Sequence, residues 1–126
     1  MSRVLVVEDH PMNRMLVREL LEHRGHEVAE ACDVEEARGA LTRGAPDIVL
    51  LDIQIPGGGG PAVLDFIRAS PALRALPVVA VTAQAMTGDR ERFLAAGFDG
   101  YVSKPIDTRS FCATIEGFLR IERSEV

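Results

Sequence analysis

The sequence has no tryptophan, one tyrosine, and only two cysteines, Cys32 and Cys112. Neither cysteine has a partner at a metal-ligand spacing, so we expect two free thiols, buried or half-buried, in a reducing compartment. No apolar run approaches the roughly 18 residues of a membrane-spanning helix, and charged residues follow Met1 too soon for a signal peptide. These absences predict a cytoplasmic protein with no membrane partner.

An excess of positive charge is also missing. The chain has 14 basic and 19 acidic residues, which give a formal net charge of −5, and its Lys and Arg residues are scattered. Because nucleic-acid binding requires clustered Lys and Arg, we expect no nucleic-acid partner. No repeat, linker or low-complexity tract divides the 126 residues. They predict a single domain, residues 1–126, with a frayed, charged end at 119–126.

Short aliphatic runs are abundant, and hydrophobic residues make up 47% of the chain. These runs predict strands at residues 3–7, 26–31, 48–52, 77–81 and 99–102. Helical spacing predicts helices from Pro11 to Gly25, from Asp33 to Gly44, from Pro61 to Ala69, from Thr87 to Ala96, and from Asp107 to Leu119. Asp33 and Glu36 have the spacing of a capping box. Met12 and Leu94 lie among the residues expected to face the core.

The alternation of strands and helices predicts an α/β fold. Right-handed crossovers favour a doubly wound, flavodoxin-like parallel sheet of five strands in the order 2-1-3-4-5, with five helices. Strands 1 and 3 are then neighbours, and ligands bind such sheets at the C-terminal ends of the strands between them. Polar residues follow four strands at this edge, namely Glu8 and Asp9, Asp52, Thr82, and Lys104.

Asp52 ends the most apolar of the predicted strands. Taken alone, such an aspartate is a cap, a metal ligand or a nucleophile. Glu8 and Asp9 are expected to face it, and three carboxylates in one crevice repel one another unless a cation lies among them. Hard oxygen ligands favour Mg²⁺, with Mn²⁺ as the alternative. His10 is not expected to be a ligand, because the other histidines are not placed to join it.

In these residues, the sequence resembles the receiver domains of two-component response regulators, which have the CheY-like fold. Four motifs carry the resemblance, namely Val-Val-Glu8-Asp9, Leu-Leu-Asp52-Ile-Gln-Ile-Pro56, Val-Thr82-Ala83 and Tyr101-Val-Ser-Lys104-Pro105. Together they extend over nearly the whole chain. The sequence is most similar to receivers of phosphorelays, including those of hybrid histidine kinases and DivK-like stand-alone receivers. The resemblance implies a response regulator in phosphorelay signal transduction.

The resemblance also implies roles for the polar residues. It makes Asp52 the residue that accepts a phosphoryl group from a phosphohistidine of a histidine kinase or histidine phosphotransferase. Asp9 and Asp52 would bind Mg²⁺ with their carboxylates, Gln54 with its backbone carbonyl, and Glu8 through water. Lys104 would neutralise charge on the transferring oxygens, because phosphoryl transfer depends mainly on positioning and electrostatic stabilisation.

The family resemblance further implies a switch. Thr82 would offer its hydroxyl to the phosphoryl group, and the small side chain of Ala83 leaves room for the donor. Tyr101 would then turn inward and change a surface formed by helix 4, strand 5 and helix 5, where a downstream protein binds. Such a protein is not an enzyme, although it assists its own phosphorylation and dephosphorylation. We expect a monomer or a weak dimer.

One segment departs from the family pattern. Between Pro56 and Pro61 the family usually has a large apolar residue and a polar residue before glycine, whereas this chain has Gly57–Gly60. Glycine removes packing and adds conformational entropy, which predicts a mobile loop beside Asp52. Gln54 and Gln84 occupy positions that border the phosphoryl site in the family and influence its hydrolysis.

Proteins of two other classes fit less well. A flavin-binding protein of the same topology needs a Ser/Thr/Gly-rich phosphate loop, where Glu8 and Asp9 would repel a phosphate. An aspartate-nucleophile phosphatase needs a second carboxylate two residues after the nucleophile, where this chain has Gln54. Within the receiver interpretation, a module detached from a hybrid histidine kinase is the alternative to a stand-alone regulator, and the natural-looking Met1 start favours the latter.

Overall fold

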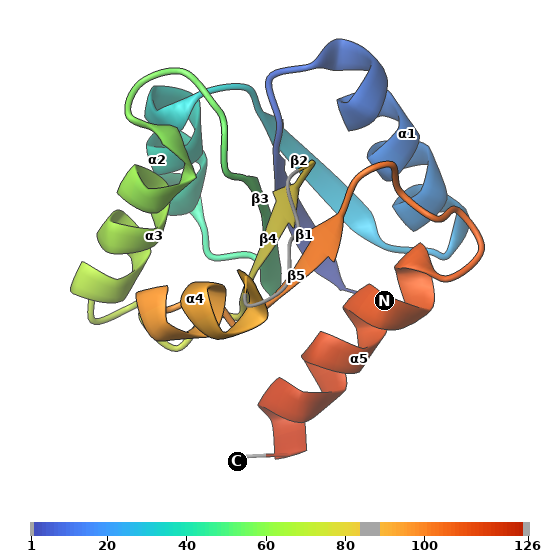
Figure 1. Ribbon diagram of the computed structural model, residues 1–126. Coiled ribbons are helices and arrows are strands. Elements are labelled where there is room, and N and C mark those ends of the chain that lie inside the picture. Colours follow the sequence, from blue (N-terminus) through green and yellow to red (C-terminus); the bar gives the residue numbers. More distant parts are fainter. Residues whose placement is uncertain (1, 84–88, 125–126) are drawn as a thin grey trace.

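A computed structural model describes residues 2–83 and 89–124. Five parallel strands form one sheet in the order β2-β1-β3-β4-β5 (Figure 1). The strands are β1 (Arg3–Val7), β2 (Glu27–Ala31), β3 (Ile48–Asp52), β4 (Val78–Thr82) and β5 (Gly100–Ser103). The helices are α1 (Pro11–His23), α2 (Val34–Arg43), α3 (Gly59–Ala69), α4 (Asp89–Ala96) and α5 (Phe111–Ser124). The predicted fold class and strand order are confirmed.

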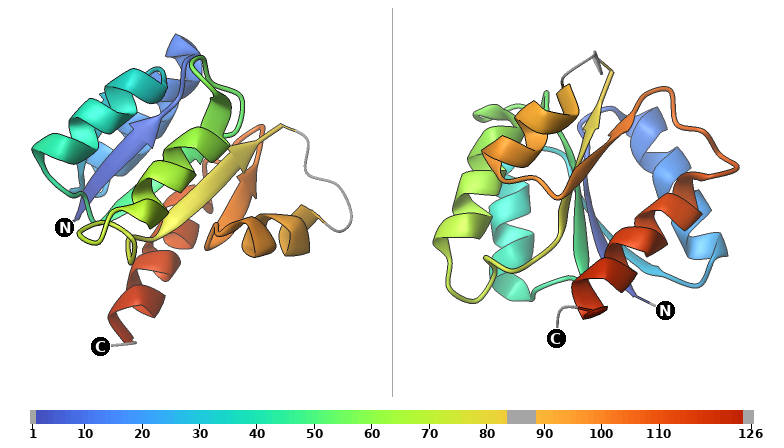
Figure 2. Two further views of the ribbon diagram at one scale, coloured as in Figure 1. Left: turned by 90° about the vertical axis from the view of Figure 1, so that its left-hand side faces the viewer. Right: turned by 60° about the horizontal axis from the view of Figure 1, so that its bottom comes forward.

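Different helices cover the two faces of the sheet (Figure 2). Helices α2, α3 and α4 pack on one face, and α1 and α5 pack on the other. Alternate residues of a strand point to opposite faces of the sheet. Leu5 and Val7 of β1 lie in the core beneath α2, α3 and α4, whereas Val4 and Val6 lie in the core beneath α1 and α5. This period of two is that of a strand buried on both faces. The central strand β3 is buried along its whole length. Its last residue, Asp52, is therefore buried as well, at the edge of the sheet where the strands end.

Local sequence explains where the helices begin. Asp33 accepts a hydrogen bond from the amide of Glu36 at 2.8 Å and caps α2 as predicted. The Glu36 carboxylate accepts from the amide of Cys32 at 2.9 Å, one residue before the cap, so the capping box is shifted by one position. Asp107 accepts from the amide of Arg109 at 3.0 Å and begins a turn, and α5 follows from Phe111.

Two apolar side chains lie outside the core that the sequence predicts for them. Met12 and Leu94 are exposed, with relative exposures of 67% and 44%. Met12 is in the first turn of α1, where the helix has only just left the edge of the sheet. Leu94 follows the buried Phe93, and consecutive helical residues point about 100° apart, so only one of them can face the sheet.

Further differences concern the bounds of the helices. The structure begins α3 at Gly59 instead of Pro61, and the predicted start of the fourth helix at Thr87 lies outside the described residues. Helix α5 continues to Ser124, and the fraying expected at 119–126 stays a prediction. None of the helices in the described ranges is long and apolar enough to cross a membrane.

The glycine segment fits closely against the end of β3. Gly57, Gly58 and Gly59 have φ angles of +94°, +121° and +81°, a region that favours glycine. The amide of Gly60 donates a hydrogen bond to the carbonyl of Ile53 at 2.8 Å. A Cβ atom on Gly60 would lie 2.8 Å from the backbone oxygen of Asp52. The turn therefore requires these glycines, and the mobility predicted for the loop remains a prediction.

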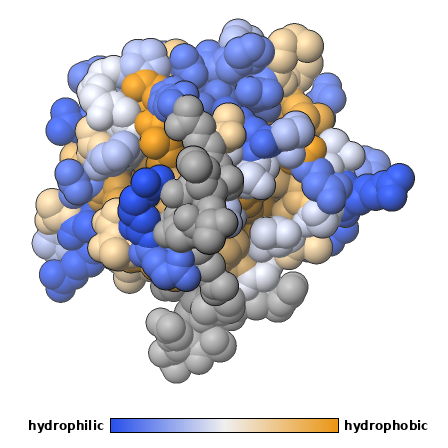
Figure 3. Space-filling view, in the orientation of Figure 1, coloured by the Kyte–Doolittle hydropathy of each residue, from blue (hydrophilic) through white to orange (hydrophobic). Residues whose placement is uncertain are grey.

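Polar residues cover much of the surface. On the face shown in Figure 3, hydrophilic side chains are interspersed with smaller apolar areas. The two thiols are free as predicted, with Cys32 half-buried and Cys112 buried.

Candidate functional site

The sheet brings the predicted acidic residues together. Strands β1 and β3 are neighbours, with Val7 paired to Leu51, so the residues that follow β1 lie beside the end of β3. One carboxylate oxygen from each of Glu8, Asp9 and Asp52 lies within 4.8 Å of the others. Glu8 and Asp52 are buried, whereas Asp9 is exposed.

A pocket of about 280 Å³ opens over these carboxylates. It is lined by Glu8, Asp9, His10, Asn13, Asp52, Gln54, Thr82, Ala83 and Lys104. These residues end or directly follow the strands β1, β3, β4 and β5, or lie in the first turn of α1. The structure therefore places all the site residues predicted at the strand ends in one pocket. Gln84 lies outside the described residues.

Lys104 contacts both buried carboxylates of the pocket. Its Nζ atom lies 2.8 Å from Oε1 of Glu8 and 3.0 Å from Oδ2 of Asp52. The backbone holds the lysine there, because its amide donates to the carbonyl of Thr82 at 2.8 Å, directly after the Thr82–Ser103 pair of β4 and β5. The side chain thus reaches from the edge strand across β4 to the ends of β3 and β1.

The other oxygens of the two buried carboxylates accept backbone hydrogen bonds. Oδ1 of Asp52 accepts from the amide of Gln54 at 3.0 Å, and Oε2 of Glu8 accepts from the amide of His10 at 3.1 Å. Charge-assisted hydrogen bonds of this kind fix the orientation of a carboxylate. Asp52 is therefore held with one oxygen toward Lys104 and the other toward its own loop.

Burial and ion pairing act against each other in this pocket. Burial raises the pKa of Glu8 above its ordinary value, and this outweighs the lowering by the hydrogen bond from Lys104. Burial lowers the pKa of Lys104, but the hydrogen bonds and charges of Glu8 and Asp52 outweigh it and leave the pKa raised. Lys104 is therefore a cation at neutral pH, set between two carboxylates.

The donor atoms around the pocket fit a hard divalent cation. Three carboxylates offer oxygens close to one another, and Mg²⁺ prefers carboxylate, carbonyl and water oxygens. The exposed Asp9 leaves one side of the group open to water, as a partly hydrated Mg²⁺ requires. His10 lines the pocket, but its neighbours are carboxylates and not the imidazole or thiolate ligands of a zinc site.

Known proteins resemble this chain over most of its length. The family model of the response regulator receiver domain matches residues 4–116. The chain belongs to this family. The receiver is similar to the polar-differentiation response regulators DivK of Brucella anthropi and Brucella ovis, each 40% identical over 116 residues, which are 92% of this chain and 94% of the relative.

Solved structures of receivers have the same fold. A CheY-like receiver domain protein from Methanospirillum hungatei JF-1 has a TM-score of 0.88 and 25% identity, with 100% of this chain and 99% of that chain covered. The receiver domain of a signal transduction histidine kinase from Syntrophus aciditrophicus has a TM-score of 0.84 and 26% identity, with 95% and 91% covered.

Tyr101, the predicted switch residue of the receiver, is half-buried in β5. Its ring centroid lies 5.6 Å from that of Phe93 in α4, and Phe93 also makes an edge-to-face contact with Phe98 at 5.8 Å. The tyrosine therefore packs against the inner side of α4. Its predicted movement stays a prediction.

Sequence reasoning missed some of the receiver's site. It gave Lys104 a role toward a phosphoryl group but did not predict the direct ion pair with Glu8. It also missed Asn13, which lines the pocket, and Arg14, which donates to the backbone oxygen of Glu8 at 2.9 Å. The available signal was their position, since both lie in the first turns of a helix that begins beside Glu8 and Asp9.

Proposed function

We propose that this receiver accepts a phosphoryl group from a phosphohistidine onto Asp52 and signals through phosphorylation-dependent protein binding. The observation that carries the proposal is the position of Asp52, whose Oδ2 atom lies 3.0 Å from Lys104 within a pocket of acidic residues. A nucleophile, a fixed cation and oxygen ligands for a metal are the components that phosphoryl transfer requires.

The proposed step is a displacement at phosphorus. A carboxylate oxygen of Asp52 attacks the phosphorus, the bond from phosphorus to the imidazole nitrogen breaks, and that nitrogen keeps the electron pair. Lys104, which is held by the acidic residues, stabilises the negative charge on the phosphoryl oxygens. Thr82, buried at the end of β4, offers its hydroxyl to the same oxygens, and Ala83 leaves the entrance open to the donor.

The same pocket is proposed to bind Mg²⁺, or Mn²⁺ in its place. Asp9 and Asp52 would hold the ion with their carboxylates, Gln54 with its carbonyl, and Glu8 through water. When bound, the ion neutralises charge on the transferring oxygens. Gln54 and Gln84 are proposed to border the phosphoryl group and to influence its hydrolysis.

The proposed donor is a histidine kinase or a histidine phosphotransferase in the cytoplasm. A stand-alone, single-domain regulator is supported by the similarity to DivK proteins, of which this chain covers 94%. A module from a hybrid histidine kinase is the second candidate, supported by the likeness to a kinase receiver domain at a TM-score of 0.84. In either case the receiver acts as a signalling protein and not as an enzyme on a separate substrate.

The proposed output surface comprises α4, β5 and α5. Tyr101 lies in β5 and contacts Phe93 of α4, so a rotation of its ring would alter the packing of both elements. A movement of Thr82 toward the phosphoryl group would make room for this rotation. A small number of coupled rotamers can bias a surface between two states.

The test is phosphorylation by acetyl phosphate, followed by mass spectrometry. Wild-type protein is expected to gain one phosphoryl group when Mg²⁺ is present and far less when the metal is chelated. Asp52→Asn is expected to gain none. Asp65→Asn, which changes an exposed aspartate on α3, is the matched control and should react like the wild type. Equal phosphorylation of Asp52→Asn and wild type would refute the assignment.

A further inference from the structure

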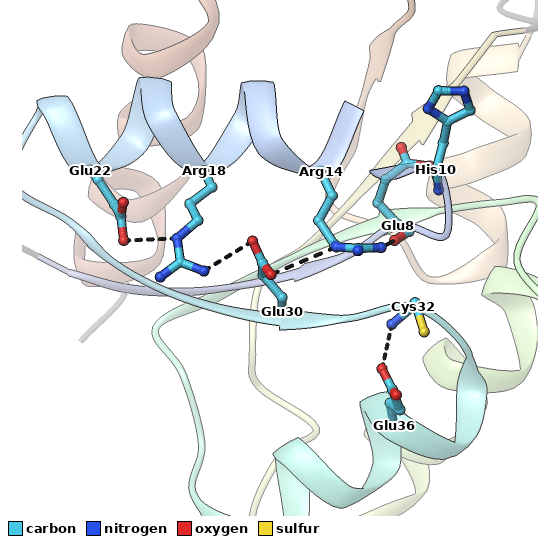
Figure 4. A network of polar contacts seen from close by, with 8 residues as sticks. All are labelled: Glu8, His10, Arg14, Arg18, Glu22, Glu30, Cys32 and Glu36. Atoms are coloured by element: carbon cyan, nitrogen blue, oxygen red, sulfur yellow. Dashed lines mark hydrogen bonds and ion pairs between the residues drawn. The ribbon is translucent and has the colours of Figure 1, made fainter. Parts of the chain in front are cut away.

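A ladder of ion pairs runs beside the acidic pocket (Figure 4). Arg18 of α1 contacts Glu22 of the same helix at 3.1 Å and Glu30 of β2 at 3.2 Å. Arg14, one turn earlier in α1, contacts the other oxygen of Glu30 at 3.7 Å. Two arginines thus share one glutamate, and Figure 4 shows the chain of contacts ending at Glu8.

The last contact of the ladder is made to the backbone. Nη1 of Arg14 donates to the carbonyl oxygen of Glu8 at 2.9 Å, and this carbonyl belongs to the peptide group that joins Glu8 to Asp9. Because a peptide group is planar, the orientation of its carbonyl sets the direction in which the Asp9 backbone continues. Arg14 therefore acts on the two residues that carry the acidic side chains, without touching those side chains.

Burial strengthens this contact. Glu8 is only 4% exposed, and a buried carbonyl needs a hydrogen-bond donor to offset its lost hydration. The Arg14 side chain is 23% exposed and Glu30 is 29% exposed, so the pair that holds the guanidinium is only partly solvated. The amide of Glu8 is held from the other side, since it donates to the carbonyl of Ala31 at 2.9 Å.

Strand periodicity explains why Glu30 can serve as the anchor. Val28 packs in the core beneath α1 and α5, and Glu30 is two residues later on the same strand. Alternate residues of a strand share a face, so Glu30 also points toward α1. Arg14 and Arg18 are four residues apart and share one side of the helix. The two elements therefore present these charges to each other.

We infer that Arg14, held by Glu30, is a positioning residue that orients the Glu8–Asp9 backbone for metal binding. This inference rests on the proposed function, because it takes the acidic pocket to be the Mg²⁺ site. Residues that orient metal ligands from outside typically change metal affinity by 10- to 100-fold when they are replaced. Since Arg14 acts through one backbone carbonyl, we expect an effect of about tenfold.

The sign of the effect distinguishes positioning from simple electrostatics. Loss of a positive charge near the pocket would by itself strengthen the binding of a cation. If Arg14 orients the metal ligands, its replacement should instead weaken the binding of the cation. Arg18→Gln provides the matched control, because it removes the same charge and also breaks an ion pair with Glu30, but its contacts are with Glu22 and Glu30 rather than with Glu8.

The experiment is calorimetric titration of the full chain with Mg²⁺, together with thermal unfolding. Arg14→Gln is expected to raise the Kd for Mg²⁺ about tenfold, whereas Arg18→Gln should stay within about twofold of the wild type. Each variant loses two polar contacts, an ion pair and a backbone hydrogen bond in Arg14→Gln and two ion pairs in Arg18→Gln, so their Tm values should be similar. In metal-free protein, the NMR amide signals of Asp9 and His10 should shift in Arg14→Gln but not in Arg18→Gln.

An unchanged or lower Kd in Arg14→Gln would overturn the inference, as would an equal weakening in both arginine variants. Glu30→Gln keeps Arg14 but removes its anchor, and it is expected to weaken binding by less than Arg14→Gln. If Arg14→Gln does not fold, an unchanged Kd in Glu30→Gln overturns the inference. If wild-type protein binds no Mg²⁺, the proposed function fails instead of this inference.

Discussion

The ammonium group of Lys104 lies 3.0 Å from Oδ2 of Asp52. The same group lies 2.8 Å from Glu8, so one cation is shared by two buried carboxylates. A metal ion bound among these residues would be held by the same carboxylates that contact the lysine. If the proposed function holds, the two cations would compete for the carboxylates in the resting protein, and both would stabilise the negative charge that develops on a phosphoryl group.

Replacement of this lysine should separate metal binding from phosphoryl transfer. Lys104→Met is expected to reduce the rate of phosphorylation by acetyl phosphate about 10²-fold, the usual effect of removing one stabilising donor. Its Mg²⁺ affinity should be equal to or higher than that of the wild type, because a competing positive charge is lost. Rates from mass spectrometry and affinities from calorimetry provide the test, with the exposed Arg109→Met as the control. A large loss of Mg²⁺ affinity would contradict the competition described above.

The two acidic residues after β1 should contribute unequally to metal binding. Glu8 is already engaged by Lys104 and by the amide of His10, whereas Asp9 is exposed and open to the pocket. Asp9→Ala is therefore expected to weaken Mg²⁺ binding more than Glu8→Ala, as measured by calorimetry or NMR titration. The reverse order would mean that Glu8 is the direct ligand.

The proposed switch should be visible in solution. Binding of the phosphoryl mimic beryllofluoride with Mg²⁺ is expected to shift NMR signals around Tyr101 and in the helices on either side, because the packing between Tyr101 and Phe93 would change. Asp52→Asn with the same reagents is the control and should show no such shifts. Shifts confined to the loops around Asp52, with residues 86–119 unchanged, would refute a switch on this surface.

The close fit of the glycine segment gives a prediction about stability. Gly60→Ala would bring a Cβ atom to 2.8 Å from the backbone oxygen of Asp52 and 2.9 Å from Cα of Ile53. The backbone must shift, and we expect a loss of about 1–3 kcal/mol in the free energy of unfolding. Urea denaturation is the measurement.

Gly39→Ala is the matched control for this substitution. Gly39 lies within α2, and the nearest atom to an added Cβ is the flexible end of Arg43 at 3.4 Å. Because alanine is the better helix former, Gly39→Ala should be neutral or stabilising by up to about 1 kcal/mol. Equal effects of the two substitutions would show that the contact with Asp52 does not constrain the loop.

A cluster remote from the pocket makes stability depend on pH. Oε2 of Glu116 in α5 lies 2.9 Å from Nε2 of the buried His26, and Oε1 accepts from Arg24 at 2.6 Å. The hydrogen bond with His26 is the largest cause that lowers the pKa of Glu116, and Arg24 adds to it. A carboxyl whose pKa is lower in the folded state stabilises the fold above its unfolded pKa, and the contribution is lost as the pH falls through the folded value.

Glu116→Gln should therefore destabilise the protein by about 1 kcal/mol at neutral pH. The difference from the wild type should decrease as the pH falls below the ordinary value of 4.5. Urea denaturation across this range measures the difference, with the exposed Glu19→Gln as the control. A difference that does not change with pH would show that the ionised form of Glu116 is not what the cluster stabilises.

Much of the receiver fold follows from local sequence. The aliphatic runs that end at Val7 and Asp52 predicted β1 and β3, since hydrophobic periodicity depends only on neighbours along the chain. The handedness of parallel crossovers favoured a doubly wound sheet, and the order 2-1-3-4-5 is a common one for such a sheet of five strands. Because the carboxyl ends of parallel strands share one edge, the meeting of Glu8, Asp9 and Asp52 was also predictable.

The sequence predicted burial and helix bounds less well where neighbouring residues give conflicting signals. Phe93 and Leu94 are adjacent apolar residues, and only the packing of α4 against the sheet decided that Phe93 is buried. Pro61 suggested the start of a helix, yet Gly59 and Gly60 already belong to α3. The close approach of Gly60 to Asp52 decided this, and such a contact has no signature in the order of residues.

The sequence by itself determined which chemical groups stand at the ends of the strands, because the lengths of strands and turns fix those positions. Only the tertiary structure decided how the groups pair. Lys104 reaches Glu8 as well as Asp52, and Arg14 reaches the backbone carbonyl of Glu8 as well as the carboxylate of Glu30. These choices depend on side-chain directions and distances between elements far apart in the chain, and periodicity carries no information about either.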